Sequence, residues 1–220
     1  MPRGFYRCAE GYLECDGVRI AGIADEVGYT PFYLTSRAQL QANFEAWEAA
    51  LQGLDGAFIG YAIKANHNLS VLRTLAGMGC GCVLVSGNEL KIAQSAGFSA
   101  AKTIFNGNGK CAWEIELAIQ LGVLINIDSL FDLDHLIAAA LATGKTARAL
   151  LRINPNIEAD VHAYVSTGTD ASKFGLTADQ VEVCLRTLKA HAASVQLVGV
   201  HCHTGSTIKD ASVFRRMGLR

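Results

Sequence analysis

A single lysine near the end of a short apolar run is the residue of this sequence best suited to covalent chemistry. The run, residues 59–65, has the composition of a buried strand and contains Lys64. Removing an ammonium group from water is costly, so burial favours the neutral amine and lowers the lysine pKa. A neutral amine is a nucleophile that can form a Schiff base with an aldehyde. We therefore expect a desolvated, nucleophilic Lys64, the alternative being a strand-end lysine that extends into solvent.

Two histidines, His201 and His203, stand near the end of another apolar run. Residues two apart on a strand project together, which would suit a metal pair, but a third ligand at motif spacing is lacking and we expect no metal. We expect His201 to be a satisfied core histidine and His203 to contact a ligand. The turn at 204–206 and a helix starting near Asp210 offer backbone N–H groups and the Ser206 hydroxyl, an arrangement that suits a phosphate.

These side chains require a framework, and the sequence predicts one of alternating strands and helices. The expected strands are residues 59–65, 82–85, 103–105, 123–127, 149–153 and 195–203, and the expected helices are residues 69–78, 88–96, 112–121, 130–142, 178–192 and a last one from about 210. Strands that are apolar on both faces, alternating with amphipathic helices, indicate a parallel sheet covered by helices. A βα barrel or a doubly wound sheet has this pattern.

The part of the chain before this repeat has a different character. Residues 6–23 carry alternating and turn-like signals around Gly11 and Asp16-Gly17, which predict a hairpin. A further strand is expected at 32–35. Ser36 then has the position of an N-cap for a helix that runs to about Gln52.

The expected framework brings the reactive residues together. On the first strand of the repeat, Lys64 shares a face with the small residues Gly60 and Ala62, and on the sixth, His203 shares a face with His201. In a parallel barrel all strands end at one mouth, which carries the active site. We therefore expect Lys64 and His203 to point into the same mouth.

Composition limits the classes of partner. Half of the 220 residues are hydrophobic and the net charge is −1, so no basic or acidic patch argues for nucleic acid or a membrane surface. The seven cysteines are odd in number and scattered, and neither a secretory signal nor a transit peptide is visible. No apolar run approaches the length of a membrane span. We expect a soluble protein of a reducing compartment with a small-molecule partner.

Several motifs resemble those of a known family. Residues 61–66 resemble the lysine signature of the alanine-racemase-fold decarboxylases, which use pyridoxal phosphate and include the diaminopimelate, ornithine and arginine decarboxylases. Within that group the sequence resembles the diaminopimelate decarboxylases, closest to their plant and algal branch. The motifs that carry this resemblance are residues 85–90, 105–110, 151–155, 166–168, 172–175 and 201–206.

The resemblance implies roles for four residues. Lys64 would hold pyridoxal 5'-phosphate covalently, His203 would stack on its ring, Ser206 would bind its phosphate, and Arg152 would lie near it. The implied reaction removes the α-carboxylate of an amino-acid substrate as carbon dioxide, with the electron pair spread into the cofactor ring. Lys64 or another acid then supplies a proton. The implied product is L-lysine, formed from meso-2,6-diaminopimelate.

The resemblance also implies an architecture. The fold would be the (β/α)8 TIM-type barrel of the alanine-racemase fold, here incomplete with about six βα units. Residues 1–30 would be an N-terminal β segment of the family's second domain, residues 31–220 a partial cofactor-binding barrel, and the C-terminal β domain would be absent. Relatives are expected to form homodimers, and the plant branch suggests the chloroplast stroma. We expect residues 1–220 alone to lack decarboxylase activity.

Other functions are compatible with the same residues. The chain could be a non-catalytic relative that binds a partner subunit, or a barrel that binds pyridoxal phosphate without turnover. It could also be another amino-acid decarboxylase of the same fold. The presence of Lys64, His203 and Ser206 argues against a decayed site.

Overall fold

The computed structural model describes residues 4–155, 157, 174–206 and 208–219. Six parallel strands form one sheet in the order of the sequence, so β4 and β9 are its edges. The sheet does not close into a barrel within these residues. The strands are β4 (Gly60–Ala62), β5 (Gly81–Leu84), β6 (Thr103–Phe105), β7 (Leu124–Ile127), β8 (Ala147–Arg152) and β9 (Val195–His201).

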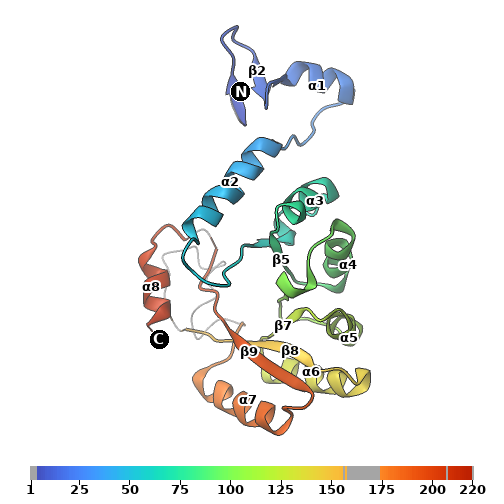
Figure 1. Ribbon diagram of the computed structural model, residues 1–220, viewed down its shortest axis with the longest axis vertical. Coiled ribbons are helices and arrows are strands. Elements are labelled where there is room, and N and C mark those ends of the chain that lie inside the picture. Colours follow the sequence, from blue (N-terminus) through green and yellow to red (C-terminus); the bar gives the residue numbers. More distant parts are fainter. Residues whose placement is uncertain (1–3, 156, 158–173, 207, 220) are drawn as a thin grey trace.

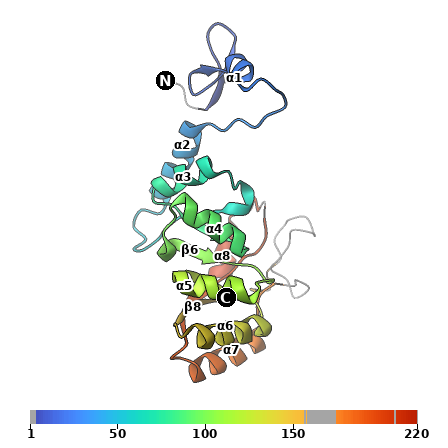
Figure 2. The same cartoon turned by 90° about the vertical axis from the view of Figure 1, so that its right-hand side faces the viewer.

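Helices alternate with these strands as predicted. They are α3 (Leu69–Gly77), α4 (Gly87–Ala96), α5 (Ala112–Leu121), α6 (Leu130–Thr143) and α7 (Ala178–Ala190), followed by the short α8 (Ser212–Gly218). Figure 2 shows α3 to α7 in one row over one face of the sheet, and Figure 1 shows α8 on the opposite side. Every connection in this row is therefore a strand–helix–strand crossover, which parallel strands require.

Local sequence fixes the ends of the helices. Ser86 and Ser129 are the N-caps of α4 and α6, and their hydroxyls accept hydrogen bonds from the amides of Glu89 and Asp132. Such a side chain satisfies one of the amides that the first turn of a helix leaves unpaired. Gly122 ends α5 in the left-handed conformation, with φ 73°, which glycine adopts without steric cost.

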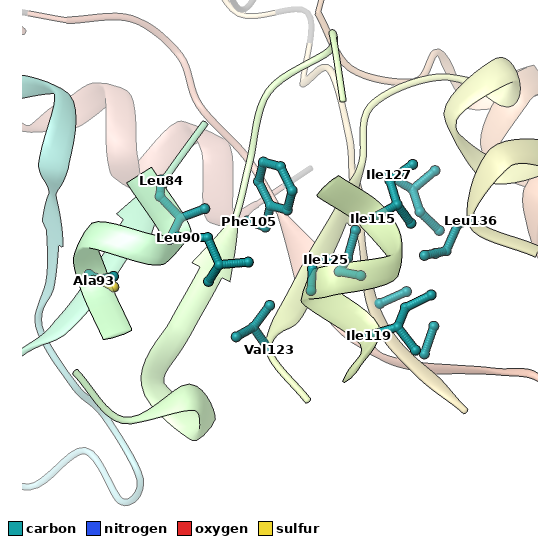
Figure 3. Packing of buried hydrophobic residues seen from close by; sticks show 14 of the residues in the cluster. Leu84, Leu90, Ala93, Phe105, Ile115, Ile119, Val123, Ile125, Ile127 and Leu136 are labelled. Carbon is teal, nitrogen blue, oxygen red and sulfur yellow. The ribbon is translucent and has the colours of Figure 1, made fainter. Parts of the chain in front are cut away.

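The hydrophobic core lies between the sheet and the row of helices. Phe105 of β6 and Ile125 of β7 point toward Leu90 of α4 and toward Ile115 and Ile119 of α5 (Figure 3). Phe105 and Ile115 are completely buried, and burying a side chain of this size contributes roughly 1.5–3 kcal/mol. Because apolar side chains fill this face of the sheet, a site for a ligand is expected at the ends of the strands instead.

The N-terminal part forms a separate antiparallel sheet of β1 (Phe5–Arg7), β2 (Leu13–Cys15) and β3 (Val18–Arg19), followed by α1 (Ile20–Val27). Figure 1 shows it at the end of the molecule, beyond α2 (Arg37–Ala50). Asp16 and Gly17 form the two-residue turn between β2 and β3, both with positive φ. The hairpin is therefore confirmed, although the predicted hairpin region continues into α1, which the sequence analysis did not predict.

Two other predictions about elements need correction. Residues 32–35 form no strand, and Tyr33 is fully exposed there, because no neighbouring strand pairs with them. The strand expected at 59–65 ends at Ala62, and residues 63–65 form the 3₁₀ helix η1 (Ile63–Ala65). By contrast, Ser36 is the N-cap of α2 as predicted and accepts a hydrogen bond from the Gln39 amide at 2.9 Å.

Candidate functional site at the carboxyl ends of the strands

Lys64 lies just beyond the carboxyl end of the edge strand β4 and is exposed. It lines an open groove of about 900 Å³, together with Tyr33 and residues of α2 and α3 such as Arg37 and Val71. The expectation of a desolvated lysine on the strand is therefore wrong. Because the chain turns into η1, Ile63 takes the buried position and Lys64 is directed into the groove.

The second predicted residue, His203, lies two residues beyond the end of β9 and is partly buried. Its pKa is lowered first by burial, then by the positive charges of Arg152 and Lys64. Charges at the ends of the first and fifth strands of the sheet therefore act on one imidazole near the end of the sixth. Lys64 acts electrostatically on His203, but the groove beside Lys64 is lined by neither His203 nor Arg152, and neither Lys64 nor His203 lies within the strand that was predicted to carry it.

His201, the last residue of β9, differs from its prediction as a satisfied core histidine. Its Nδ1 is buried and has no hydrogen-bond partner among the described residues. Burial, Arg152 and His203 lower the His201 pKa to about 4, whereas Asp128 raises it. The imidazole is thus neutral at physiological pH, and Nδ1 is left to a group from outside the described chain.

Arg152, the last residue of β8, is buried and forms an ion pair with Asp128 at the end of β7. Arg152 Nη1 donates to Asp128 Oδ2 at 2.7 Å. The guanidinium carbon also lies 4.6 Å from the centre of the Phe174 ring. Arg152 is therefore held on two sides next to the histidines, and its charge is neutralised only in part by Asp128.

Ser206 follows His203 in a turn and is exposed. The expected helix after it begins two residues later than predicted, at Ser212, and its first amide donates to Asp210 Oδ1 at 2.9 Å. This helix start is therefore occupied by a carboxylate of its own chain. The groups still available for the expected phosphate contacts are therefore the hydroxyl of Ser206 and the backbone of the turn at 204–206, and not the helix start.

Sequence reasoning missed a group of buried polar residues that fixes the loops around these strand ends. Lys110 Nζ donates to Asp132 Oδ2 at 2.6 Å, and the same oxygen accepts from the Asp128 amide at 3.0 Å. Glu114 accepts from the Gly87 amide at 2.6 Å and from the Cys111 amide at 2.8 Å. Glu114 stands three residues after Cys111, the spacing of a capping box, so this part was detectable in the sequence.

Two of the sequence motifs fall wholly or partly outside the described residues. The motif at 166–168 lies wholly outside them, and of Ser172-Lys173-Phe174-Gly175 the first two residues do. The remaining Phe174 and Gly175 lie against Arg152 and Asp128. Among the described residues, no three histidine, cysteine, aspartate or glutamate side chains are grouped to hold a metal ion, and no helix there is long and apolar enough to cross a membrane.

Comparison with known proteins identifies the family. Residues 37–217 match the model of the pyridoxal-dependent decarboxylases, pyridoxal binding domain. The chain belongs to this family. The resemblance seen in the sequence motifs is thereby confirmed, and pyridoxal phosphate is the cofactor that membership implies.

The sequence relatives of this family member are diaminopimelate decarboxylases. The chain is similar to a probable chloroplastic diaminopimelate decarboxylase of Oryza sativa subsp. japonica, with 48% identity over 97% of this chain and 43% of that protein. Its identity to diaminopimelate decarboxylase of Neisseria meningitidis serogroup B is 40% over 91% of the chain and 48% of the relative. The chain thus spans about half the length of these curated relatives.

Solved structures agree with the predicted fold class. Diaminopimelate decarboxylase of M. jannaschii in complex with L-lysine has a TM-score of 0.85 and 35% identity, over 96% of this chain and 50% of that one. An arginine decarboxylase from the Paramecium bursaria Chlorella virus, at 22% identity and TM-score 0.74, shares the fold. The alanine-racemase-type architecture with six βα units and a preceding β segment is therefore confirmed.

The residues present fit the implied cofactor. Lys64 offers an accessible primary amine at the end of β4, although the groove that it lines contains none of the other three residues with implied cofactor roles, Arg152, His203 and Ser206. A partly buried imidazole, His203, lies within electrostatic reach of this amine. The buried, unpartnered Nδ1 of His201 marks a place where the described chain leaves a polar atom for another group.

Proposed function

We propose that this chain carries the cofactor-binding part of a diaminopimelate decarboxylase, which converts meso-2,6-diaminopimelate to L-lysine and carbon dioxide. The observation that carries the proposal is the match of residues 37–217 to the pyridoxal binding domain, with an accessible Lys64 amine just beyond the end of β4. The charge of Lys64 also helps to lower the pKa of the His203 imidazole. The similarity to diaminopimelate decarboxylases from plants, bacteria and archaea supports this substrate.

Four residues have proposed roles toward pyridoxal phosphate. Lys64 binds it covalently through Nζ, and His203 packs its ring against the pyridine ring. Ser206 donates its hydroxyl hydrogen to the phosphate. Arg152, fixed by Asp128 and Phe174, places a positive charge beside both histidines.

Three groups then have proposed parts in the reaction: the cofactor, His203 and Lys64. When bound, pyridoxal phosphate supplies an electron sink for the electron pair that remains when the substrate carboxylate leaves. His203 keeps the cofactor ring in one orientation and excludes water from one side of it. Because burial and two cations hold the His203 pKa down, the imidazole stays neutral and adds no charge against the ring. Lys64 Nζ would carry the proton that takes the place of the departing carboxylate.

Absorbance spectroscopy tests the cofactor assignment. Purified protein incubated with pyridoxal phosphate should show an absorbance band near the visible edge that disappears on borohydride reduction. Lys64→Ala removes the amine and should abolish the band, whereas Lys91→Ala, an exposed lysine on α4, should keep it. A band of wild-type size in Lys64→Ala would overturn the role of Lys64.

A substrate comparison tests the activity. The intact protein should release carbon dioxide from meso-diaminopimelate and form L-lysine, with much lower rates on ornithine and arginine. A preference for ornithine or arginine would favour another decarboxylase of the same fold. Cofactor binding without carbon dioxide release from any of the three would favour the non-catalytic alternatives, cofactor binding without turnover or binding to a partner subunit.

The proposal extends to organisation and location. We propose that residues 1–30 belong to a second, β-rich domain and residues 31–220 to the cofactor-binding barrel, because β1–β3 form a sheet of their own. We also propose that the whole enzyme is a homodimer and acts in the chloroplast stroma, the latter on the similarity to the chloroplastic Oryza protein. Sedimentation of the intact protein and imaging of a fluorescent fusion test these two points.

A further inference from the structure

Asp128 is a buried carboxylate that joins three segments at the carboxyl ends of the strands. Its side chain is completely buried. Oδ2 accepts from Arg152 Nη1 of β8 at 2.7 Å, and Oδ1 accepts from the Gly175 amide at 2.8 Å. Both oxygens are therefore occupied by groups that lie outside β7, the strand that Asp128 follows.

The strand register places Asp128 in one row with the arginine and a histidine. Ile127 pairs with Leu151, so Asp128 stands level with Arg152, and Arg152 pairs with His201. Residues that pair on neighbouring parallel strands project their side chains from the same face of the sheet. The row at the carboxyl end thus runs Asp128, Arg152, His201, with the ion pair between its first two members.

The segment after Gly175 reinforces this arrangement. The Leu176 amide donates to the Arg152 carbonyl at 2.7 Å, and the Asn154 amide donates to the Leu176 carbonyl at 3.0 Å. Gly175 has φ +82°, and a Cβ there would lie 3.1 Å from the Asn154 amide nitrogen. Because Phe174 lies on the guanidinium, the backbone that Asp128 holds also fixes the ring that covers Arg152.

Arg152 in turn acts on both imidazoles. Its charge lowers the pKa of His201 and of His203. The other charged or titratable groups that affect these two rings are Lys64 for His203, and His203 and Asp128 for His201. The pKa values of both histidines therefore depend on where the Arg152 guanidinium lies.

We propose that Asp128 is a positioning residue that holds the Arg152 guanidinium beside His201 and His203 and acts on His203 through Arg152. A buried ion pair contributes little net stability compared with apolar residues of the same volume, so placement of the cation explains it better than stability does. The benefit to the reaction rests on the proposed function, whereas the placement itself does not.

The first test is the titration of the His203 ring by NMR in the intact protein, freed of cofactor. Asp128→Leu removes both acceptor oxygens at similar volume, so Arg152 is released and its effect on His203 is lost. The His203 midpoint should rise by roughly half a pH unit or more. Asp134→Leu, on an exposed position of α6, is the matched control and should leave the midpoint unchanged. An unchanged midpoint in Asp128→Leu would overturn the proposal.

A second comparison decides the question even if Asp128→Leu does not fold. Arg152→Gln removes the cation, and Asp128→Leu/Arg152→Gln removes both partners, so no uncompensated charge stays buried. Both variants should show the same raised His203 midpoint, because Asp128 acts on His203 only through Arg152. A difference between them would overturn the proposal. These titrations use neither cofactor nor substrate, so their outcome is separate from that of the decarboxylase assays.

Discussion

The two histidines at the end of β9 lie beside an arginine whose charge reaches both rings. Burial is the largest cause of their lowered pKa values, and Arg152 is the next. Protonating either ring would place a second cation close to the guanidinium with little water to screen it. The site therefore favours neutral imidazoles, which suits both the buried Nδ1 of His201 and the proposed stacking of His203 on a pyridine ring.

This has a consequence for stability against pH. The His201 pKa is about 4 in the folded protein and 6.5 in an ordinary histidine. Between these values the unfolded state binds a proton that the folded state does not, so the free energy of unfolding falls as the pH is lowered from 6.5 to 4. This loss of stability is at most on the order of 3 kcal/mol, and above pH 6.5 His201 causes no such loss because its ring is neutral in both states.

Replacing His201 by Gln should remove this contribution. Urea unfolding at pH 7 and pH 4.5 should therefore show a smaller loss of stability in His201→Gln than in the wild type. His135→Gln, which removes an exposed imidazole on α6, should lose as much stability as the wild type over the same interval. Equal losses in all three proteins would contradict the low His201 pKa.

At the scale of single residues, the sequence suggested which side chains could do chemistry but did not predict how buried or how well hydrogen-bonded they are. The type and spacing of Lys64, His203 and Ser206 were sufficient to suggest their chemistry. The burial of Lys64 was predicted wrongly because the turn into η1 depends on Ile63 packing into the core, which the apolar run does not reveal. The unpartnered Nδ1 of His201 depends on its neighbours in space and has no sequence signal.

The loops that carry the site are connected to one another by buried charges. Lys110, between β6 and α5, reaches Asp132 in the first turn of α6, and Glu114 of α5 reaches the first amide of α4. Carboxylates at helix N-termini are favoured by the helix dipole, which partly offsets the cost of burying them. Each of these contacts fixes one strand–helix loop relative to its neighbour.

The Lys110–Asp132 pair gives a prediction for this connection. The Lys110 side chain is completely buried, so Lys110→Met leaves the Asp132 carboxylate without a counter-charge and should lower the free energy of unfolding by about 3–5 kcal/mol. Lys110→Met/Asp132→Asn removes the stranded charge and should recover most of this loss. Arg186→Met, in the exposed pair with Glu182, should change stability by less than about 1 kcal/mol. Urea unfolding measures all three, and no recovery in the double variant would contradict the explanation.

The elements themselves were largely predictable. All six strands of the parallel sheet and the helices between them were anticipated to within a few residues, because strands buried on both faces are apolar runs and the helices have polar caps. The errors lie where the presence or the end of a strand depends on pairing with a neighbouring strand. Residues 32–35 have strand-like composition but no neighbour to pair with, and β9 ends at His201 rather than His203.

At the scale of the whole molecule, the order of the sheet leaves β4 and β9 at opposite edges. Lys64 and His203 follow these two edge strands, so the proposed cofactor site lies between the edges. In the described residues neither edge has a strand on its outer side, and Val200 of β9 is 63% exposed. The geometry of the site therefore depends on whatever holds the two edges relative to each other.

A polypeptide of residues 1–220 alone should consequently lack decarboxylase activity. The relatives that carry the activity are about twice as long. Carbon dioxide release from meso-diaminopimelate by this polypeptide and by a full-length relative provides the comparison. A rate similar to that of the relative would show that six strands are sufficient to align Lys64 with His203.

The buried carboxylates also restrict how this architecture can be recombined. Glu114 needs the Gly87 amide, Asp132 needs the Lys110 amine, and Asp128 needs Arg152, and each partner belongs to an adjoining strand–helix unit. A single strand–helix unit moved into another barrel would carry its buried carboxylate without the group that binds this carboxylate here. The smallest piece that can be exchanged intact is therefore a run of consecutive units, and chimaeric proteins should join more successfully outside residues 85–175 than within them.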